Sequence, residues 1–253
     1  MSAPPAAPWA SADPYSTALR TGRGPLFLRR TDGWLLPLEV ERWCARADTV
    51  DRRVLDRCEG AVLDVGCGPG RLVAELAARG RAALGVDVSE TAVAQTRGLG
   101  GQALCRSVFD PLPGEGRWGT VLLMDGNIGI GGDPHTLLAR VAQLLTPGGL
   151  LMAEAAPVDV DERASVQVTD SPGHLGHPGD HPFPWARLGL PALLRYAAGA
   201  GLRPAGQWSV GGRSFAALRS RTASSTPDPA NNAAVTSSQW PRYTSAERPV
   251  ADR

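Results

Sequence analysis

The chain has 253 residues, 43% of them hydrophobic, and a formal net charge of +1. This length and apolar content suit one domain with a sizeable core, and the near-neutral charge argues against nucleic acid or an acidic membrane as partner. All 26 basic residues are arginines, so the sequence excludes Schiff-base chemistry and the lysine of a Walker A loop.

The cysteines and the apolar runs indicate in which cellular compartment the protein resides. The four cysteines lie at scattered spacings without a CxxC pair, which argues against a disulfide framework and a zinc knuckle. No apolar run approaches the roughly 20 residues that a membrane-spanning helix needs. The first residues lack the basic start and apolar core of a signal peptide. We therefore expect a cytoplasmic protein with reduced thiols.

The two ends of the chain differ in composition from its middle. Residues 221–253 are rich in Ser, Thr, Pro and Asn, and residues 1–14 are rich in Ala and Pro, which predicts disordered tails. In residues 15–59, the stretches "LPLEVERWCARA" and "VDRRVLDRC" carry apolar residues at helical spacing and predict two short helices. Residues 60–220 follow as the main domain.

In residues 60–220, short β runs alternate with helical segments. This alternation predicts parallel crossovers and an open α/β sheet of seven mostly parallel strands flanked by helices. A pair of glycines between the last two runs predicts a closing antiparallel hairpin. The expected strands are 61–65, 82–88, 102–108, 119–124, 149–155, 205–210 and 213–218, and the expected helices are 71–79, 89–97, 134–145 and 191–200.

Two glycine-rich stretches follow predicted strands, "LDVGCGPGRL" and "MDGNIGIGGDP". Ligands of open parallel sheets bind outside the carboxyl ends of the strands, so either stretch is a candidate site. The dinucleotide fingerprint GxGxxG fails in the first stretch, because its last glycine would fall on Arg71 or on Val73. The glycines of the second stretch are followed directly by Asp133 and Pro134, with no lysine and no serine or threonine placed to bind a magnesium ion, which argues against a nucleotide phosphate loop.

The first stretch resembles the DxGxGxG loop of class I (Rossmann-like) S-adenosylmethionine-dependent methyltransferases. Further on, "GVDVS" places Asp87 where that family has an acidic residue that binds the ribose hydroxyls, and "LLTPGGLLMAEA" resembles the turn into the family's fifth strand. The resemblance implies S-adenosylmethionine as cofactor and a small-molecule acceptor. It also implies that the cofactor-binding residues are Asp64, Gly66, Cys67, Gly68, Gly70, Asp87, Val88, Ser107, Val108, Asp110 and Met124.

The third strand matches the family less well than the first two. Family members often carry an acidic residue beside the adenine just after this strand. Here either Ser107 or Asp110 is a candidate for contact with the adenine amino group. Asp110 precedes Pro111, so it is equally a candidate turn residue.

The second glycine-rich stretch corresponds to the loop after the fourth strand of the family's fold, which faces the methyl group and the acceptor. Asp125 and Asn127 are its polar candidates for catalysis, with Asp125 as the general base if one is used. We expect its glycines to leave room for the acceptor. The family's amino-methylating enzymes of nucleic acid carry [DN]PP[YF] here, and its absence argues against a DNA or RNA acceptor. Asp125 and Glu154 together could hold a metal ion, but the ligand pair of catechol-type relatives is incomplete, so we expect none.

Two other segments resemble parts that shape the substrate pocket in relatives. Segments such as residues 15–59 commonly form a lid of helices over the cofactor. The aromatic residues and arginines there would suit an anionic or aromatic small molecule, or an amphipathic cover whose arginines are solvated. His174, His177 and His181 lie in a Gly- and Pro-rich stretch that is a solvated loop, a cover over the acceptor, or a metal site with Asp180.

We infer an S-adenosylmethionine-dependent methyltransferase acting on an oxygen or nitrogen atom, or a carbon atom, of a small molecule by in-line displacement. The alternatives are a nicotinamide-dinucleotide oxidoreductase and a non-catalytic S-adenosylmethionine-binding protein. The sequence leaves open the acceptor, the atom that is methylated and the oligomeric state.

Overall fold

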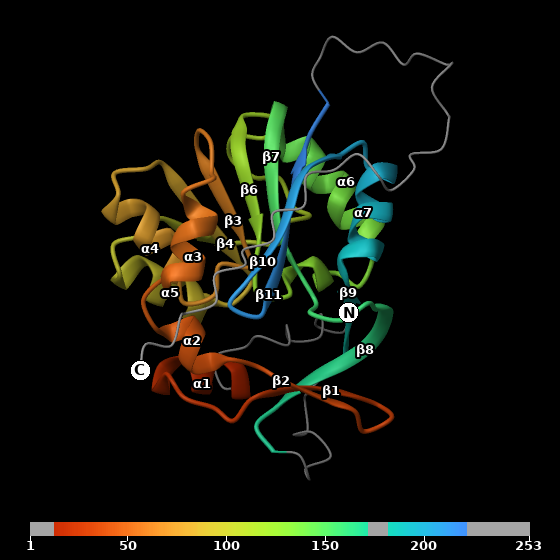
Figure 1. The fold of residues 1–253 in the computed structure, drawn as a ribbon. Coiled ribbons are helices and arrows are strands. Elements are labelled where there is room, and N and C mark those ends of the chain that lie inside the picture. Colours follow the sequence, from red (N-terminus) through yellow and green to blue (C-terminus); the bar gives the residue numbers. More distant parts are fainter. Residues whose placement is uncertain (1–12, 172–181, 222–253) are drawn as a thin grey trace, which may run out of the picture.

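The computed structural model describes residues 13–171 and 182–221. Its main layer is a sheet built from β3 (Val62–Val65), β4 (Ala83–Asp87), β5 (Ala103–Cys105), β6 (Trp118–Leu123), β7 (Leu145–Ala155), β10 (Arg203–Val210) and β11 (Arg213–Arg219). The strand order is β10-β11-β7-β6-β3-β4-β5 (Figure 1). β5, β4, β3, β6 and β7 run parallel, whereas β11 is antiparallel to both β7 and β10.

Helices cover both faces of this sheet (Figure 1). Apolar residues from the helices and strands form a buried cluster on each face, and β3 is buried along its whole length, as expected of a central parallel strand. The covering helices are α3 (Thr49–Leu55), α4 (Arg71–Ala78) and α5 (Glu90–Gly98) on one face, and α6 (Pro134–Leu144) and α7 (Leu190–Gly199) on the other.

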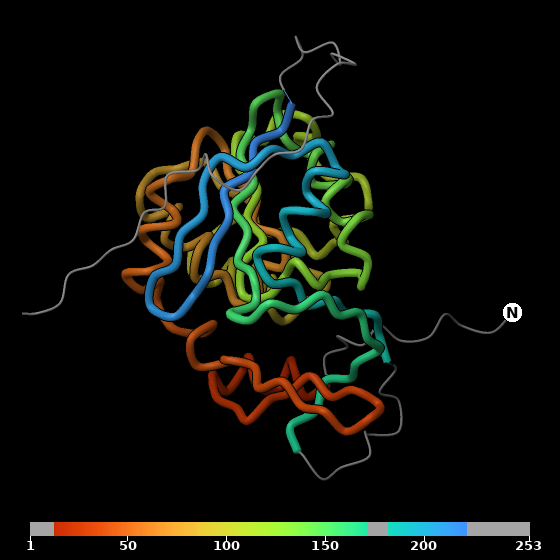
Figure 2. The backbone as a smooth tube through the Cα atoms, turned by 45° about the vertical axis from the view of Figure 1, so that its right-hand side comes forward, coloured from red at the N-terminus to blue at the C-terminus, as the bar shows by residue number. Residues whose placement is uncertain are grey.

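A second sheet lies across the carboxyl ends of the main parallel strands, and we call it the lid sheet. It consists of β1 (Phe27–Arg30), β2 (Leu35–Pro37), β8 (Asp161–Thr169) and β9 (Phe183–Leu188), in the antiparallel order β2-β1-β8-β9. Figure 2 shows β1 and β2 beside β8, although these segments are far apart in sequence. Leu28 and Val168, which pair across β1 and β8, pack with the short helices α1 (Pro14–Thr21) and α2 (Val40–Cys44).

The fold class is confirmed, with its seven mostly parallel strands and its antiparallel hairpin at β10 and β11. The lid predicted as helices was wrong in part, since residues 15–59 also contain β1 and β2. The helix expected over residues 36–47 is shortened to α2, because the residues before it form β2. β8 and β9 had no counterpart among the predictions.

The boundary of the amino-terminal tail also differs from the prediction. Asp13 caps α1 by accepting a hydrogen bond from the Ser16 backbone N–H at 2.6 Å, so the helix begins at Pro14. Residues 1–12 and 222–253 of the predicted tails lie outside the described residues. Within residues 13–171 and 182–221, no helix is long and apolar enough to cross a bilayer.

Candidate cofactor and acceptor site

A cavity of about 310 Å³ lies between the main sheet and the lid sheet. Its floor follows the carboxyl ends of β3, β4, β5 and β6, where ligands of open α/β sheets bind. Its other walls come from α1, α2, β1, β8 and β9. The lining residues include Tyr15, Leu28, Leu38, Trp43, Gly66, Gly68, Arg71, Asp87, Val88, Ser107, Phe109, Asp125, Asn127, Val168, Phe183 and Trp185.

The loop after β3 has a backbone that only glycine suits. Gly66, Gly68 and Gly70 have φ angles of +71°, +53° and +89°. A Cβ on Gly66 would lie 2.6 Å from Nδ2 of Asn127, and one on Gly70 would lie 2.7 Å from Cβ of Thr96. Gly66 and Gly68 line the cavity, while Gly70 turns the chain into α4. The loop therefore offers bare backbone to a ligand.

Asp87 lies at the carboxyl end of β4 and lines the cavity. Its Oδ2 accepts a hydrogen bond from the Gly68 N–H at 2.9 Å, and its Oδ1 accepts one from the Ser89 N–H at 2.9 Å. Burial raises the pKa of this carboxyl, and these backbone donors only partly oppose it. Each carboxylate oxygen keeps a lone pair that can accept a hydrogen bond from a hydroxyl of a ligand.

Asp64 lies on the strand just before the glycine loop, and its residue is 2% exposed. Its Oδ2 is buried and has no hydrogen-bond partner among the described residues. Burial raises the pKa of Asp64 to about 7, although Arg71 opposes the shift. An unpartnered buried oxygen costs free energy, so this carboxyl is suited to meet a cationic group.

The predicted cofactor residues beyond β4 separate into two groups. Val88, Ser107 and Val108 line the cavity. Asp110 and Met124 do not: Asp110 is exposed, and its carbonyl accepts a hydrogen bond from Arg140 in the turn after β5. Met124 is 1% exposed, in the apolar cluster beneath the sheet. Of Ser107 and Asp110, the two candidates for contact with the adenine, only Ser107 lines the cavity.

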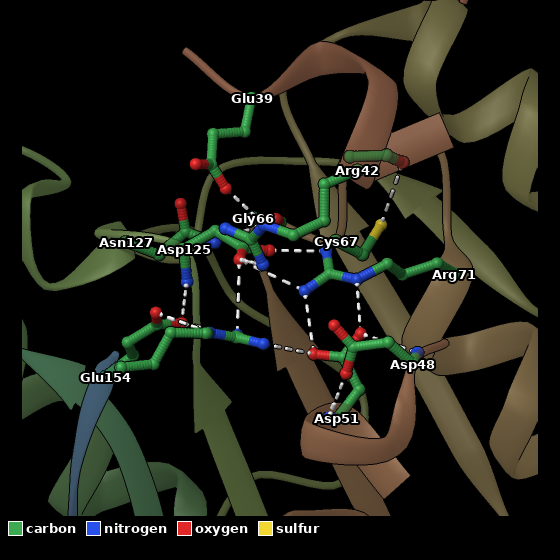
Figure 3. A network of polar contacts seen from close by, with 12 residues as sticks. Glu39, Arg42, Asp48, Asp51, Gly66, Cys67, Arg71, Asp125, Asn127 and Glu154 are labelled. Carbon is green, nitrogen blue, oxygen red and sulfur yellow. Dashed lines mark hydrogen bonds and ion pairs between the residues drawn. The ribbon is translucent and has the colours of Figure 1, made fainter. Parts of the chain in front are cut away.

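Asp125 takes part in a buried charge network, which Figure 3 shows from close by. Its Oδ1 accepts a hydrogen bond from Arg42 at 2.7 Å and one from Arg71 Nη2 at 3.0 Å, and Arg71 Nη1 donates to Oδ2. A third guanidinium, that of Arg213, lies 3.5 Å away. The network consists of Arg42, Asp51, Arg71, Asp125, Glu154 and Arg213.

The other carboxylates of the network are paired in the same way. Asp51, whose side chain is 1% exposed, accepts hydrogen bonds from Arg71 at 2.9 and 3.1 Å and from Arg213 at 2.8 Å. Burial raises its pKa, but the two arginines outweigh burial and hold it far below its ordinary value. Both oxygens of Glu154 accept hydrogen bonds from Arg213, at 2.7 and 2.8 Å. No cluster of His, Cys, Asp and Glu in the described residues could hold a metal ion.

The backbone of Asp125 is also unusual. Its φ of +58° places it in the left-handed region, and no other described non-glycine residue has a positive φ. This turn aims its N–H at Oε2 of Glu154, 2.9 Å away. Burial raises the pKa of Asp125, but Arg71, Arg42 and Arg213 outweigh burial and lower it. With both oxygens held by arginines, the geometry favours an ionised anchor over a proton acceptor, and catalysis by Asp125 stays a prediction.

Asn127 has a fixed amide beside the glycine loop. Its Nδ2 donates to the carbonyls of Val65 at 2.9 Å and Gly66 at 2.8 Å. These two bonds set which end of the amide is nitrogen. Asn127 lines the cavity, and no described residue donates to its Oδ1. The side chain can therefore accept one hydrogen bond from a molecule in the cavity.

The second glycine-rich loop makes room for other parts of the chain. A Cβ on Gly129 would lie 2.6 Å from the Trp185 ring, and one on Gly131 would lie 2.8 Å from the Phe109 ring. A Cβ on Gly132 would meet Pro184. At these three glycines, the chain's own atoms take the space that was expected for the acceptor. A Cβ on Gly126 would meet nothing within 4 Å, so space for the acceptor beside that glycine stays a prediction.

Several cavity residues were missed from the sequence. Trp43, Phe183 and Trp185 line the cavity from the lid sheet and α2. The alternating apolar run "FPWARL" was the available signal for β9. Tyr15, from the segment expected as a lid, does line the cavity. The stretch with His174, His177, Asp180 and His181 lies outside the described residues.

Comparison with known proteins links this geometry to a family. Residues 62–149 match a family model for a methyltransferase domain. The chain contains a methyltransferase domain. Its main sheet has the class I fold of S-adenosylmethionine-dependent methyltransferases. A search of curated proteins finds no match.

Solved structures similar to this methyltransferase domain come from several bacteria. An S-adenosylmethionine-dependent methyltransferase from Bacteroides fragilis is 19% identical, with a TM-score of 0.66 and coverage of 82% of this chain and 92% of that chain. The 1,6-didemethyltoxoflavin-N1-methyltransferase of Burkholderia thailandensis is 19% identical, with a TM-score of 0.54 over 87% and 93%. A sugar N-methyltransferase from Streptoalloteichus is 20% identical, with a TM-score of 0.51 over 71% and 88%.

S-adenosylmethionine is the cofactor of this class, and the residues of the cavity fit it. Asp87 lines the cavity with carboxylate oxygens that can accept hydrogen bonds from the ribose hydroxyls. Asp64 lies behind the glycine loop and is not among the lining residues. Val88 and Phe109, which are 42% and 40% exposed, offer apolar surface for the adenine. The bare backbone at Gly66 and Gly68 allows close approach.

Proposed function

We propose that this methyltransferase transfers a methyl group to a nitrogen or oxygen atom, or a carbon atom, of a small molecule bound beneath the lid sheet. One observation carries the proposal: a single cavity joins the glycine loop and Asp87 on its floor to an apolar wall from the lid sheet. Such a cavity holds two reactants side by side. The Burkholderia neighbour, a 1,6-didemethyltoxoflavin-N1-methyltransferase by name, and the Streptoalloteichus neighbour, a sugar N-methyltransferase by name, support a small acceptor.

The chain's own residues act mainly by positioning. S-adenosylmethionine, when bound, supplies a methyl group that is already activated on a sulfonium. Asp87 and the glycine loop hold the cofactor, Asn127 accepts a hydrogen bond from the acceptor, and the lid sheet excludes water. Alignment of two reactants lowers a barrier by about 7–11 kcal/mol. A general base adds only about 10²–10⁴ in rate, so the proposal does not require one.

The test is transfer of labelled methyl groups. Purified protein is incubated with methyl-labelled S-adenosylmethionine and a small-molecule extract of the source cells, and products are identified by mass spectrometry. We expect a labelled small molecule with wild type and with the surface variant Asp110→Ala, and little or none with Asp87→Ala. Label on nucleic acid, or no labelled product from any extract fraction, would contradict the proposal. Oxidation of NADH that requires the purified protein, with the same extract as substrate, would favour the oxidoreductase instead.

A further inference from the structure

We propose that the acceptor is a flat aromatic or heteroaromatic molecule bound between Trp43 on α2 and the Phe183–Trp185 pair on β9. The inference rests on the proposed function and specifies its substrate. It follows from which side chains the lid sheet and α2 present to the cavity, and from how firmly those side chains are held.

The acceptor side of the cavity is apolar in the described part of the chain. None of the side chains that β1, α2, β8, β9 and the β2–α2 connection contribute to the cavity carries a charge. Near them, Asp125 is already paired with Arg42 and Arg71. A sugar or an aliphatic amine would bury several hydroxyls or an ammonium here without partners, whereas a flat ring would bury apolar surface on both faces. The contributing side chains are Leu28, Leu38, Trp43, Val168, Phe183, Pro184 and Trp185.

The β9 side of the cavity is a rigid aromatic wall. Phe183 and Trp185 meet edge to face, with ring centroids 6.1 Å apart and an interplanar angle of 88°. A backbone bridge joins Trp185 to Ile130 in the loop after β6, and the Trp185 ring lies directly against Gly129. The wall is thus fixed to the same loop that carries Asn127, which places bound rings beside the fixed amide.

The α2 part of the cavity lining carries an unused hydrogen-bond donor. Trp43 lies beside Tyr15, with ring centroids 6.4 Å apart. The preceding residue, Arg42, is anchored on Asp125, which holds α2 in place. The Trp43 indole N–H is buried and has no acceptor among the described residues. After a small shift of the Trp43 ring, a carbonyl oxygen or ring nitrogen of a flat substrate would accept a hydrogen bond from this N–H, which favours a heteroaromatic molecule.

The test measures which class of molecule the loaded protein retains. Protein saturated with S-adenosylhomocysteine is dialysed to equilibrium against quinolin-4-ol, xanthine, D-glucosamine and ethanolamine together. We expect retention of quinolin-4-ol or xanthine, about tenfold weaker in Trp185→Leu and about fivefold weaker in Trp43→Phe, which keeps an aromatic ring but removes the indole N–H. Trp34→Leu is the matched control, because Trp34 stacks on Arg30 and Arg187 outside the cavity.

Calorimetry with S-adenosylhomocysteine checks the fold of each variant. If Trp185→Leu fails to bind it, Phe183→Leu takes its place. Preferred retention of glucosamine or ethanolamine, retention of none of the four, or equal losses in Trp185→Leu and Trp34→Leu would overturn the inference. Failure of wild type to bind S-adenosylhomocysteine would instead count against the proposed function, so the two failures are distinguishable.

Discussion

Replacing Asp125 by Asn removes the central negative charge of the buried charge network. In wild type, the carboxylate faces the guanidiniums of Arg42, Arg71 and Arg213. The amide keeps one acceptor oxygen but turns an N–H₂ group toward an arginine. The buried Asp51 and Glu154 and the exposed Glu39, which pairs with Arg42, are then left to balance the three guanidiniums.

The expected cost follows from burial. The Arg71 and Asp125 side chains are 4% and 12% exposed, so solvent screens their pairing only weakly. Removing one partner of a buried ion pair costs about 3–5 kcal/mol. For a urea m-value of about 2–3 kcal/mol/M, the unfolding midpoint should fall by about 1–2.5 M.

Urea unfolding followed by circular dichroism measures this midpoint. Asp110→Asn is the matched control, because Asp110 is exposed in a turn and surface substitutions change stability by about 0.5 kcal/mol or less. The arginines lower the Asp125 pKa, so its contribution is present above pH 4 and is lost as pH falls through the folded pKa. The difference between wild type and Asp125→Asn should therefore shrink in acid.

A general base would give the opposite pattern. Asp125→Asn would then keep a wild-type midpoint and lose about 10²–10⁴ in kcat. A midpoint shift below about 0.5 M at pH 7 would refute the anchor role that we derive from the arginine contacts.

Three further predictions concern the cofactor side of the cavity. Asp87→Ala should weaken S-adenosylmethionine binding more than tenfold in calorimetry, since two charge-assisted hydrogen bonds are lost; an unchanged Kd would remove Asp87 from the site. Gly70→Ala should lower the free energy of unfolding by about 2–4 kcal/mol. The loss should exceed that of the control Gly100→Ala, because Gly100 also has a positive φ of +83° but a Cβ there would meet nothing within 4 Å. Equal losses would show that the Thr96 side chain moves aside without cost. Burial raises the Asp64 pKa to about 7, so affinity for S-adenosylmethionine should rise about tenfold per pH unit up to pH 7 and level off above it. Asp64→Asn should abolish this pH dependence. Parallel pH profiles of wild type and Asp64→Asn would contradict the loss of a proton from Asp64 on binding.

The main sheet was predictable because its signals are local. β3, β4, β6 and β7 are apolar runs that glycine turns and capped helices separate, and each predicted strand overlaps an observed one. The glycine loop was readable for a related reason: only glycine tolerates the positive φ angles at Gly66, Gly68 and Gly70.

The lid sheet was not predictable in the same way, because its pairing is not local. β1 and β2 are four and three residues long, and β1 includes two arginines. Their partner, β8, lies far along the chain, and Leu28 pairs with Val168 there. Such short strands form only when a distant segment supplies the hydrogen bonds and the apolar face.

The buried charge network was hidden for an electrostatic reason. A lone arginine at the start of a helix usually indicates a solvated side chain, yet Arg71 is buried between Asp51 and Asp125. Neither acid is close to it in sequence. Asp125 had the position expected of a catalytic residue, after a parallel strand, but only the structure places arginines on both of its oxygens.

Calorimetric titration with S-adenosylmethionine tests the central claim most directly. Wild type should bind one S-adenosylmethionine per chain, Asp87→Ala should bind it more than tenfold more weakly, and NADH should give no binding heat. Binding of NADH in competition with S-adenosylmethionine, or equal affinities for wild type and Asp87→Ala, would contradict the assignment of this cavity to the methyl donor.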